Sequence, residues 1–316
     1  MSRTITSGDL LADRRYAYAQ GCLDDGDPDA AMEMAEQALE IAPRFAPAWF
    51  LLGRAREARH GLTGRAADHH AALRAYANAL EIDPDDREGA RIALVRIGDG
   101  AAGTAISPGY VQALFDAYAP RFDRHLVEGL SYRGHEVLAA ALDGAGGLGR
   151  VIDLGCGTGL VGVALGDRPE HLTGIDLSPG MLGVAERRGC YHRLVPGEVV
   201  ATLTTEPPES ADCVTAADVM IYVGDFSGVL AATARALRPN GRFAFTVQSH
   251  PGDGLILGTD ARYAHGDALV REAIAAAGLD LQVFEPAAVR RENGIDVPGR
   301  VVVAGKPAGL RSRLVP

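Results

Sequence analysis

From Arg150 to the C-terminus, two hydrophobic periods alternate along the chain. Short apolar runs of strand character are followed by stretches whose apolar residues recur at helical spacing. This alternation predicts a mostly parallel sheet with helices on both faces, an α/β fold whose ligands bind at the carboxyl ends of the strands. The expected strands are 151–154, 171–176, 191–196, 212–217, 242–248, 280–285 and 299–305, and the expected helices are 159–166, 178–188, 226–237 and 265–277.

The N-terminal region has a different pattern, rich in alanine and leucine at helical spacing. Two sets of positions repeat, and each set ends in Leu-Glu-Ile followed, one residue later, by a proline. The two prolines, Pro43 and Pro84, lie 41 residues apart. The usual period of a tetratricopeptide repeat is about 34 residues, so an insertion of about seven within 57–68 accounts for the difference. The matching positions are Ala31, Ala35, Ala38, Leu39 and Pro43, and then Ala72, Tyr76, Ala79, Leu80 and Pro84.

This region resembles two tetratricopeptide units followed by a third helix at 85–97. Trp49, Leu52 and Gly53 stand where the repeat places its first-helix aromatic, leucine and glycine. About three units are usually needed for independent stability, so we expect packing on the rest of the chain or on another subunit. Two interpretations remain open, a docking surface for a peptide or carrier protein and a structural arm for homodimerisation or stability.

Length, charge and cysteine spacing limit the class of protein. The 316 residues suggest two domains, and the net charge of −10 argues against a nucleic-acid partner or an anionic membrane. No run approaches about 18 apolar residues and the N-terminus lacks a signal-peptide core, so we expect a cytoplasmic protein. The four cysteines show no Cys-x-x-Cys spacing, which predicts neither a disulfide framework nor a metal site. The last residues, 310–316, resemble a protease-tag linker.

The stretch 151–162 runs from a strand into a turn with a glycine at every second position, Val-Ile-Asp-Leu-Gly-Cys-Gly-Thr-Gly-Leu-Val-Gly. Glycine lacks the Cβ that would keep a ligand away from the backbone, and the following helix amides favour an anionic group. The GxGxxG string from Gly157 to Gly162 is weak evidence by itself. The additional Gly155, with Asp153 two residues before it, gives the Asp-x-Gly-x-Gly-x-Gly pattern of an S-adenosylmethionine loop. A tight turn without a ligand is the structural alternative.

A carboxylate at Asp153 can accept hydrogen bonds from the ammonium of a methionine moiety, directly or through water, whereas it would repel a pyrophosphate. Asp176 ends the next strand, about twenty residues further on, where an acid holds ribose hydroxyls. The C-terminal half resembles the class I S-adenosylmethionine-dependent methyltransferases, and the whole chain resembles predicted methyltransferases that contain tetratricopeptide repeats. The resemblance implies a Rossmann-like fold with the last strand antiparallel beside the fifth, and S-adenosylmethionine as cofactor.

The same resemblance implies which residues contact the cofactor. Glu198 would accept a hydrogen bond from the adenine amino group, although a solvated glutamate after Pro196 is an equally open interpretation. The expected cofactor residues in this half are Asp153, Gly155, Gly157, Gly159, Asp176, Leu177, Met181, Glu198 and Asp218.

The segment 110–145 resembles the helices that precede the catalytic fold and cover the cofactor and one wall of the substrate pocket. By this resemblance, Tyr110, Tyr118 and Phe122 lie over the cofactor, while core packing is the alternative for Phe122 and for Phe115. The expected domains are a tetratricopeptide-like region at 1–98, a linker at 99–109, a helical cap at 110–145, a methyltransferase domain at 146–307 and a tail at 308–316.

Methyl transfer from a sulfonium mainly requires alignment of the nucleophile, and a base only where the acceptor must lose a proton. By resemblance, Asp218 at the end of the fourth strand faces the transferred methyl, and it could hold the methionine ammonium or position or deprotonate the acceptor. Tyr222 would line the pocket. His265 is the best candidate base, since imidazole titrates near physiological pH. A turn-forming aspartate and a helix-entry histidine are the structural alternatives, and 290–292 could bind an acidic acceptor or form surface ion pairs.

These observations predict a metal-free, S-adenosylmethionine-dependent transfer of a methyl group to O or N of a small-molecule acceptor. One alternative assigns the acceptor to a protein or carrier-bound group docked by the repeats. A second is a non-catalytic cofactor-binding scaffold. A third, an NAD-dependent oxidoreductase, is disfavoured because the two closing strands have no helix between them.

Overall fold

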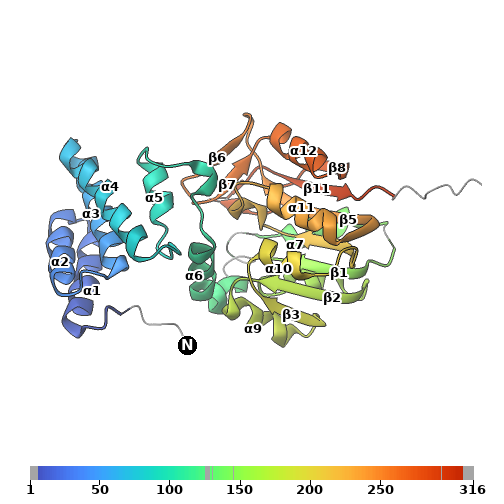
Figure 1. Ribbon diagram of the computed structural model, residues 1–316, viewed down its shortest axis with the longest axis horizontal. Coiled ribbons are helices and arrows are strands. Elements are labelled where there is room, and N and C mark those ends of the chain that lie inside the picture. The colour runs from blue at the N-terminus through green and yellow to red at the C-terminus, as the bar shows by residue number, and fades with distance from the viewer. Residues whose placement is uncertain (1–5, 125–128, 130, 145, 293, 309–316) are drawn as a thin grey trace, which may run out of the picture. The chain divides into compact units, whose positions relative to one another are not determined.

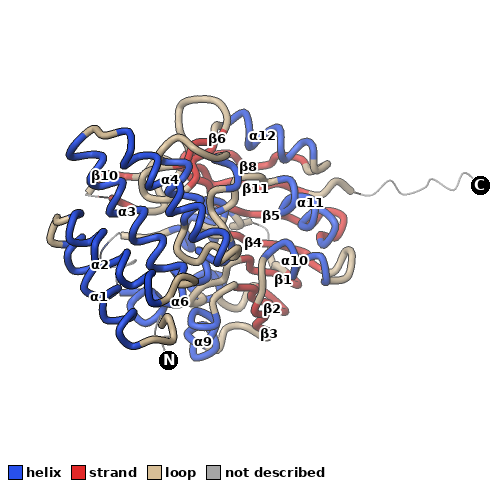
Figure 2. The backbone as a smooth tube through the Cα atoms, turned by 60° about the vertical axis from the view of Figure 1, so that its left-hand side comes forward, coloured by secondary structure: helices blue, strands red, loops and turns tan. Residues whose placement is uncertain are grey.

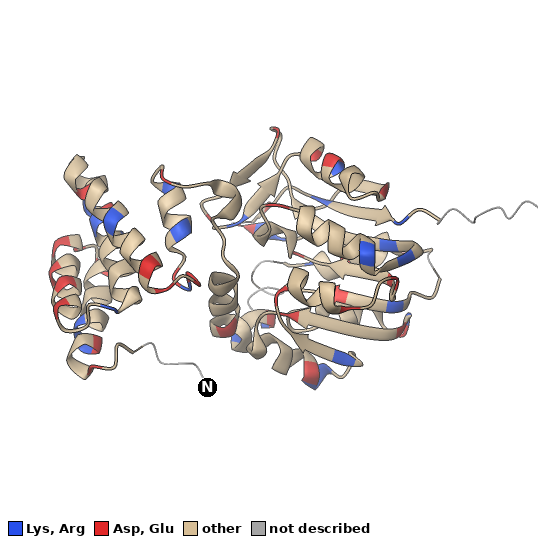
Figure 3. Ribbon diagram, in the orientation of Figure 1, with Lys and Arg blue, Asp and Glu red and all other residues tan. Residues whose placement is uncertain are grey.

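The computed structural model describes residues 6–124, 129, 131–144, 146–292 and 294–308. The expected linker-like tail at 310–316 therefore lies outside the described residues. The chain divides into two compact units, Met1–Ala113 and Leu114–Pro316. No helix in the described part of the chain has the length and apolar character needed to cross a membrane. Acidic and basic residues are interspersed along the backbone of both units (Figure 3).

The N-terminal unit consists of helical hairpins (Figure 1). Its α-helices pack in sequence, α1 on α2, α2 on α3 and α3 on α4. At Gly53 a Cβ would lie 2.5 Å from the Tyr76 ring, so only glycine permits this approach of α3 and α4. The helices are α1 (Leu10–Asp24), α2 (Pro28–Ile41), α3 (Ala46–Thr63), α4 (Ala66–Ile82) and α5 (Ala90–Arg96), with α6 (Pro108–Tyr118) crossing the boundary between the units.

The second hairpin has longer helices than the first, and this accounts for its extended repeat. The α3 and α4 helices contain 18 and 17 residues, against 15 and 14 for α1 and α2. The extra residues thus add about one turn to each helix, because an α-helix has about 3.6 residues per turn. Near the α3–α4 turn, Asp68 is buried and accepts from Arg59 Nε at 2.9 Å.

The C-terminal unit contains a seven-stranded sheet in the order β3-β2-β1-β4-β5-β11-β8. The β11 strand pairs antiparallel with both β5 and β8, whereas the neighbours from β3 to β5 pair in parallel. The expected mostly parallel sheet with an antiparallel last strand beside the fifth is confirmed. Its strands are β1 (Gly149–Leu154), β2 (Pro169–Asp176), β3 (Arg193–Pro196), β4 (Ala211–Ala216), β5 (Leu237–Gln248), β8 (Asp280–Pro286) and β11 (Gly299–Gly305).

Helices cover both faces of this sheet (Figure 2). One apolar core joins the sheet to α10, α11 and α12, and a second joins it to α7 and α8. The order of strands reverses between β1 and β4, which places a switch point at their carboxyl ends. The helices are α7 (Gly134–Ala141), α8 (Leu160–Leu165), α9 (Pro179–Arg188), α10 (Val199–Thr205), α11 (Ser227–Ala236) and α12 (Asp267–Ala276).

Two features of this unit differ from the sequence expectation. The α10 helix was not expected, and the expected helix at 265–277 begins only at Asp267. His265 instead closes β7 (Tyr263–His265), which pairs with β6 (Leu255–Leu257) in a small hairpin. Strands of three residues are too short to show a hydrophobic period, so these two strands could not be predicted from periodicity.

Candidate functional site

The glycine turn after β1 uses its three glycines in different ways. All three have positive φ, 58° at Gly155, 54° at Gly157 and 93° at Gly159. A Cβ at Gly155 would lie 2.4 Å from Cγ2 of Val219, so the turn packs directly against the segment that follows β4. A Cβ at Gly157 would meet nothing closer than 4.0 Å, so the turn presents open backbone there. Such a backbone can be approached closely by a ligand.

Asp176 at the end of β2 is tied to this turn. Its two carboxylate oxygens accept from the amides of Gly157 and Ser178, each at 2.8 Å. Burial raises the pKa of Asp176, and the two amide donors oppose that rise. Each oxygen retains acceptor capacity, because a carboxylate has about four lone-pair sites. The geometry therefore leaves Asp176 able to accept from the hydroxyls of a bound ribose.

Asp153 is differently placed, with no exposed surface. Its carboxylate accepts from the hydroxyl of Tyr191 at 2.6 Å and from that of Thr215 at 2.7 Å. Burial raises the pKa of Asp153 to about 7 even though both hydroxyls favour the ionised form. The expected direct contact with a methionine ammonium is not supported in this conformation, because the side chain points into the interior between β1, β4 and Tyr191.

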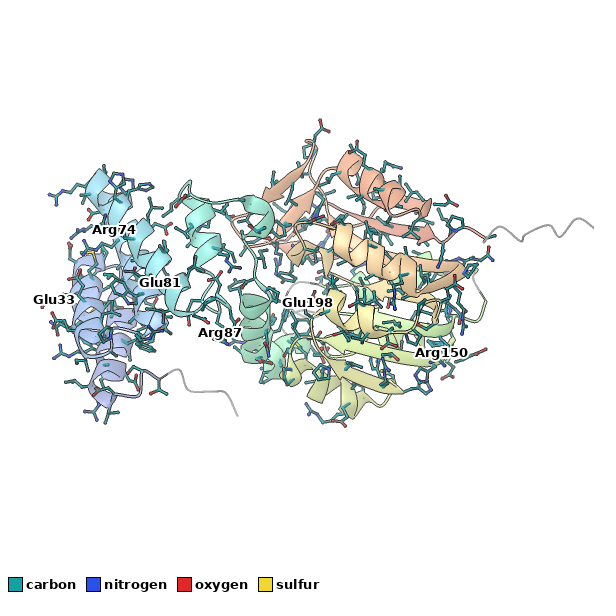
Figure 4. All side chains as sticks on the ribbon, in the orientation of Figure 1. Glu33, Arg74, Glu81, Arg87, Arg150 and Glu198 are labelled. Atoms are coloured by element: carbon teal, nitrogen blue, oxygen red, sulfur yellow. The ribbon has the colours of Figure 1, made fainter. Side chains whose placement is uncertain are left out.

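The residues expected around adenine fall into two groups. Leu177 is half-buried beside Asp176, whereas Met181 on α9 is 1% exposed, so this conformation does not offer Met181 to adenine. Glu198 begins α10, where its Oε2 accepts from the Ala201 amide at 2.7 Å. Figure 4 shows Glu198 at this position. Glu198 is thus a helix cap in the structure, and its contact with adenine stays a prediction.

Four aromatic rings from two segments, 115–122 and the residues after β4, meet in the C-terminal unit. Phe122 lies 6.0 Å from Phe115 and 5.2 Å from Tyr118, measured between ring centroids. Phe115 also contacts Tyr222 edge to face at 5.5 Å. We call Phe115, Tyr118, Phe122 and Tyr222 the aromatic cluster. It brings Tyr222, after β4, together with two of the three aromatic residues expected over the cofactor.

Tyr110, the third of these aromatic residues, belongs to the N-terminal unit. There its ring packs where a Cβ on Gly89 would come within 2.9 Å of it. Its expected place over the cofactor stays a prediction.

Two aspartates missed by the sequence interpretation connect the 114–123 segment to the glycine turn and to the start of α9. Asp116 Oδ1 accepts from Ser178 Oγ at 2.5 Å and from the Gly180 amide at 3.2 Å. Asp123 accepts from the Thr158 hydroxyl at 2.6 Å and forms an ion pair with Arg188. Only the series of alternating aromatic and acidic residues gave a signal for them in the sequence.

Asp218 follows β4 with a strained backbone, φ 57°. Its amide donates to Thr246 Oγ1 at 2.9 Å, and its Oδ2 lies 3.5 Å from Arg290 Nη1. Its Oδ1 is buried and has no hydrogen-bond partner among the described residues. Burial raises the pKa of Asp218, while Arg290 and Arg262 oppose that rise. A buried carboxylate oxygen without a partner is costly unless a ligand uses it.

Arg290 is 2% exposed, so the interpretation of 290–292 as ordinary surface ion pairs is wrong for this residue. Its guanidinium donates to Gln248 Oε1 at 2.5 Å and to Glu292 Oε1 at 3.1 Å, and lies 3.7 Å from Asp260. Arg262 donates to the same Glu292 oxygen at 2.8 Å. We call this group the polar cluster, and its members are Asp218, Gln248, Asp260, Arg262, Arg290 and Glu292.

The aromatic and polar clusters meet at Tyr222. Arg262 hydrogen-bonds the Tyr222 hydroxyl. Burial raises the pKa of Tyr222, with Arg262 acting against the rise, so the phenol stays protonated and can donate. No group of three His, Cys, Asp or Glu side chains suited to a metal ion was found within the described ranges.

His265 does not lie open to a substrate. It is 0% exposed, its Nε2 lies 3.0 Å from the Val223 carbonyl, and its ring stacks on Phe226 at 4.3 Å. Burial lowers the pKa of His265 to about 4. Because the ring has no exposed surface and Nε2 carries the proton that it donates to that carbonyl, these contacts do not support a general base, and the expected role of His265 stays a prediction.

Comparisons with known proteins match both parts of the chain. Residues 152–245 match the "Methyltransferase domain" family model, and residues 12–55 match the "Tetratricopeptide repeat" model. A protein named ubiquinone biosynthesis O-methyltransferase from Idiomarina loihiensis is 32% identical over 116 residues, which are 34% of this chain and 46% of the relative. Its namesake from Aeromonas salmonicida is 34% identical over 131 residues, 38% of this chain and 53% of the relative. The chain thus spans about half the length of these relatives.

Solved structures share the fold. The N1-methyltransferase of 1,6-didemethyltoxoflavin from Burkholderia thailandensis superposes with a TM-score of 0.50 at 21% identity, covering 63% of this chain and 89% of that chain. The [4+2]-cyclase SpnF also gives a TM-score of 0.50, at 19% identity, covering 63% and 96%. These identities show the fold alone, and the two proteins are named for different reactions.

The domain match, the order of the strands and the aspartate–glycine turn agree on S-adenosylmethionine as the cofactor. Both parts of the family resemblance seen in the sequence are confirmed. The chain carries a class I S-adenosylmethionine-dependent methyltransferase domain behind tetratricopeptide repeats.

Proposed function

We propose that this protein transfers a methyl group from S-adenosylmethionine to an oxygen or nitrogen of a small-molecule acceptor. When bound, the cofactor supplies a methyl group activated by the adjacent sulfonium. The chain's own residues then need mainly to hold the two reactants in line and exclude water, which supplies a large part of the rate of such displacements. A base is required only for an acceptor that must lose its proton.

The residues of the cofactor turn fit S-adenosylmethionine. Gly157 presents backbone that no side chain covers, and Asp176 keeps acceptor capacity for the ribose hydroxyls. Among the described residues, no lysine or arginine is hydrogen-bonded or ion-paired to Asp176. Arg188 lies beside the turn, where a Cβ on Gly159 would come within 3.2 Å of its side chain, but it is paired with Asp123. An acid without a cationic partner suits an uncharged ribose better than a diphosphate.

The single observation that carries the proposal is the free oxygen of Asp218 beside the cofactor turn. Val219 packs on Gly155 of the glycine turn, and Asp218 is the residue immediately before Val219 in the chain. One of its oxygens is buried and has no hydrogen-bond partner in the described part of the chain, and burial raises the pKa of the carboxyl. A carboxylate in this state can accept the hydrogen of an acceptor O–H or N–H and align its lone pair.

Oxygen is the favoured acceptor atom. The two relatives described above are named as O-methyltransferases, although each is matched over about half its length. The aromatic cluster adjoins the protonated hydroxyl of Tyr222, which suits a flat acceptor with polar substituents. An aromatic hydroxyl would find ring contacts on one side and the free Asp218 oxygen as its hydrogen-bond acceptor.

The proposal is tested by calorimetry followed by a turnover assay on the full chain. We expect S-adenosylmethionine and S-adenosylhomocysteine to bind in about the micromolar range and NADH not to bind. The assay then measures release of S-adenosylhomocysteine with a panel of phenols, catechols and nitrogen heterocycles. Cofactor binding without release from any acceptor class would contradict small-molecule methyl transfer and favour the scaffold or a cyclase-like reaction.

A groove in the N-terminal unit favours a second candidate, in which the acceptor is carried by a protein. It has a volume of about 680 Å³ between α2, α3 and α4, and its lining includes Leu39, Trp49, Leu52, Arg74 and Asn78. Tetratricopeptide hairpins commonly present such concave surfaces to partners. Arg74→Glu on this lining should leave small-molecule turnover unchanged. Loss of methylation confined to a protein-bound acceptor would establish the second candidate.

A further inference from the structure

We propose that Arg290 is a positioning residue that holds Asp218 with one carboxylate oxygen directed away from the polar cluster and available to the acceptor. The inference rests on the proposed function, because it assigns Asp218 to the acceptor. The sequence drew attention to Arg290 only as part of 290–292, a segment that could bind an acidic acceptor or form surface ion pairs. Arg290 lies in a loop after β8, 72 residues away from Asp218.

Arg290 lies across the ends of two neighbouring strands. Asp218 follows β4 and Gln248 ends β5, and these two strands pair in parallel. Arg290 reaches both, with Nη1 at 3.5 Å from Asp218 Oδ2 and Nη2 at 2.5 Å from Gln248 Oε1. A planar guanidinium that holds two groups through different nitrogens fixes their relative orientation.

Arg290 is itself held in place by hydrogen bonds. Its Nε donates to Glu292 at 3.1 Å, and Glu292 is held in turn by Arg262 at 2.8 Å. The Arg290 side chain is 1% exposed, so water does not compete for these bonds. Burying a guanidinium is costly without ion pairs, and a structural role alone would not require an approach to the partly strained Asp218.

The two carboxylate oxygens of Asp218 have different surroundings. Oδ2 is the one that faces Arg290, whereas Oδ1 is buried with no partner in the described part of the chain. The contact with Arg290 thus occupies one edge of the carboxylate and leaves the other free. The polar cluster contains three carboxyl groups, on Asp218, Asp260 and Glu292, and only two guanidinium groups. Charge pairing alone therefore does not account for the contact of Arg290 with Asp218.

A test by pH must consider every ionisable group that faces Asp218. Arg290 and Arg262 act to lower its pKa. The phenols of Tyr132 and Tyr222 interact with it and remain protonated, because burial raises the pKa of both. The groups to be held constant in a comparison are therefore Arg262, Asp260, Glu292, Tyr132 and Tyr222.

The experiment compares Arg290→Gln and Arg290→Lys with Arg291→Gln. The Arg291 side chain is 56% exposed and forms an ion pair with Asp296, outside the polar cluster. The carboxyl carbon of Asp218 is followed by NMR in protein labelled at aspartate, and its signal is identified by its loss in Asp218→Asn. We expect Arg290→Gln to raise the titration midpoint of Asp218 by about one pH unit or more, since an opposite charge within 4–6 Å lowers a carboxyl pKa by about that amount. Arg291→Gln should leave the midpoint unchanged.

Turnover gives the second readout. We expect Arg290→Gln to lower kcat about tenfold or more while the Kd for S-adenosylmethionine changes less than about threefold. In the Asp218→Asn background the same substitution should cause no further loss, because a positioning residue acts through the group that it holds. Arg290→Lys keeps the cation, so the titration midpoint of Asp218 should stay close to that of the unmodified protein. The variant should still lower kcat, because lysine lacks the planar guanidinium that holds both partners.

Three outcomes would overturn the inference: an unchanged Asp218 midpoint in Arg290→Gln, equal losses of turnover with and without Asp218, or full activity in Arg290→Lys and Arg290→Gln. The titration needs neither cofactor nor acceptor. Failure of S-adenosylmethionine to bind the unmodified protein would therefore end the proposed function, whereas an unmoved midpoint in a cofactor-binding protein would end only the role of Arg290. If Arg290→Gln fails to fold, the turnover of Arg290→Lys decides, because full activity in that variant would overturn the inference.

Discussion

The hydroxyl of Tyr191 donates to Asp153 at 2.6 Å, and this bond fastens the segment before β3 to the first strand of the sheet. Asp153 has no exposed surface, so its carboxylate depends on Tyr191 and Thr215 for its hydrogen bonds. The aspartate that precedes the glycine turn thus supports the turn from inside the fold. Tyr191 also packs against the turn, because a Cβ on Gly159 would come within 3.1 Å of its ring.

Tyr191→Phe should reduce the free energy of unfolding by about 1–3 kcal/mol, since it leaves a buried carboxylate oxygen without its donor. Urea unfolding followed by circular dichroism measures the change. Tyr18→Phe is the matched control, because Tyr18 is 65% exposed and should change stability by less than about 0.5 kcal/mol. Equal stability of the two variants would contradict the supporting role of the Tyr191–Asp153 bond.

Asp176→Ala should weaken binding of S-adenosylmethionine by about 10- to 100-fold, because it removes the acceptor for the ribose hydroxyls and the brace on the Gly157 amide. Titration calorimetry measures the affinity. Asp143→Ala provides the control, since Asp143 has a side chain that is 76% exposed and pairs with Arg168. Unchanged affinity in Asp176→Ala would remove this residue from the cofactor site.

His265→Gln should alter the acid stability of the protein while leaving methyl transfer largely intact. The folded-state pKa of His265 is lowered to about 4, so the folded protein binds fewer protons than the unfolded chain between about pH 6.5 and pH 4. Stability from this group is therefore complete above about pH 6.5 and is lost as the pH falls through that range. The predicted total is about 3 kcal/mol.

Urea unfolding at pH 7, 5.5 and 4.5 checks this prediction. The unmodified protein should lose more stability over this range than His265→Gln does. A loss of turnover in a folded His265→Gln variant, with cofactor affinity retained, would support the histidine as a catalytic residue and contradict this prediction.

Sequence reasoning was most successful where the information is local. The alternation of strand and helix, the glycine turn and Asp176 depend on neighbours within a few residues, and all three have the expected secondary structure. The repeated helical hairpins were equally visible, because small residues at matching positions leave a periodic trace.

The polar cluster could not be predicted in the same way. Arg290 and Asp218 are 72 residues apart, and no spacing rule links a loop after β8 with the end of β4. The sequence likewise could not show that His265 is covered by Phe226, since this burial depends on how the residue before α11 meets the small β6–β7 hairpin. Contacts that form only when distant strands assemble leave no local pattern, so these residues were interpreted from their types alone.

The contact between Asp123 and Thr158 leads to the final prediction. Asp123 belongs to the segment expected to cover the cofactor, and Thr158 lies within the glycine turn, so their 2.6 Å hydrogen bond joins the cover to the turn. Asp123→Ala should raise the Kd for S-adenosylmethionine about tenfold, mainly through faster dissociation, because a cover that opens more often releases its ligand sooner. Stopped-flow fluorescence with S-adenosylhomocysteine as the displacing ligand separates the two rates. Arg124→Gln, an exposed neighbour, should bind as the unmodified protein does.

A double-mutant cycle with Thr158→Val isolates this bond from the ion pair that Asp123 also makes with Arg188. If the hydrogen bond controls release, the two substitutions should be non-additive, and the double variant should dissociate little faster than Asp123→Ala alone. Strictly additive effects would assign the change to the Arg188 ion pair. Dissociation rates that do not move in any of these variants would show that the 114–123 segment does not restrain the cofactor, whatever its contacts with the turn.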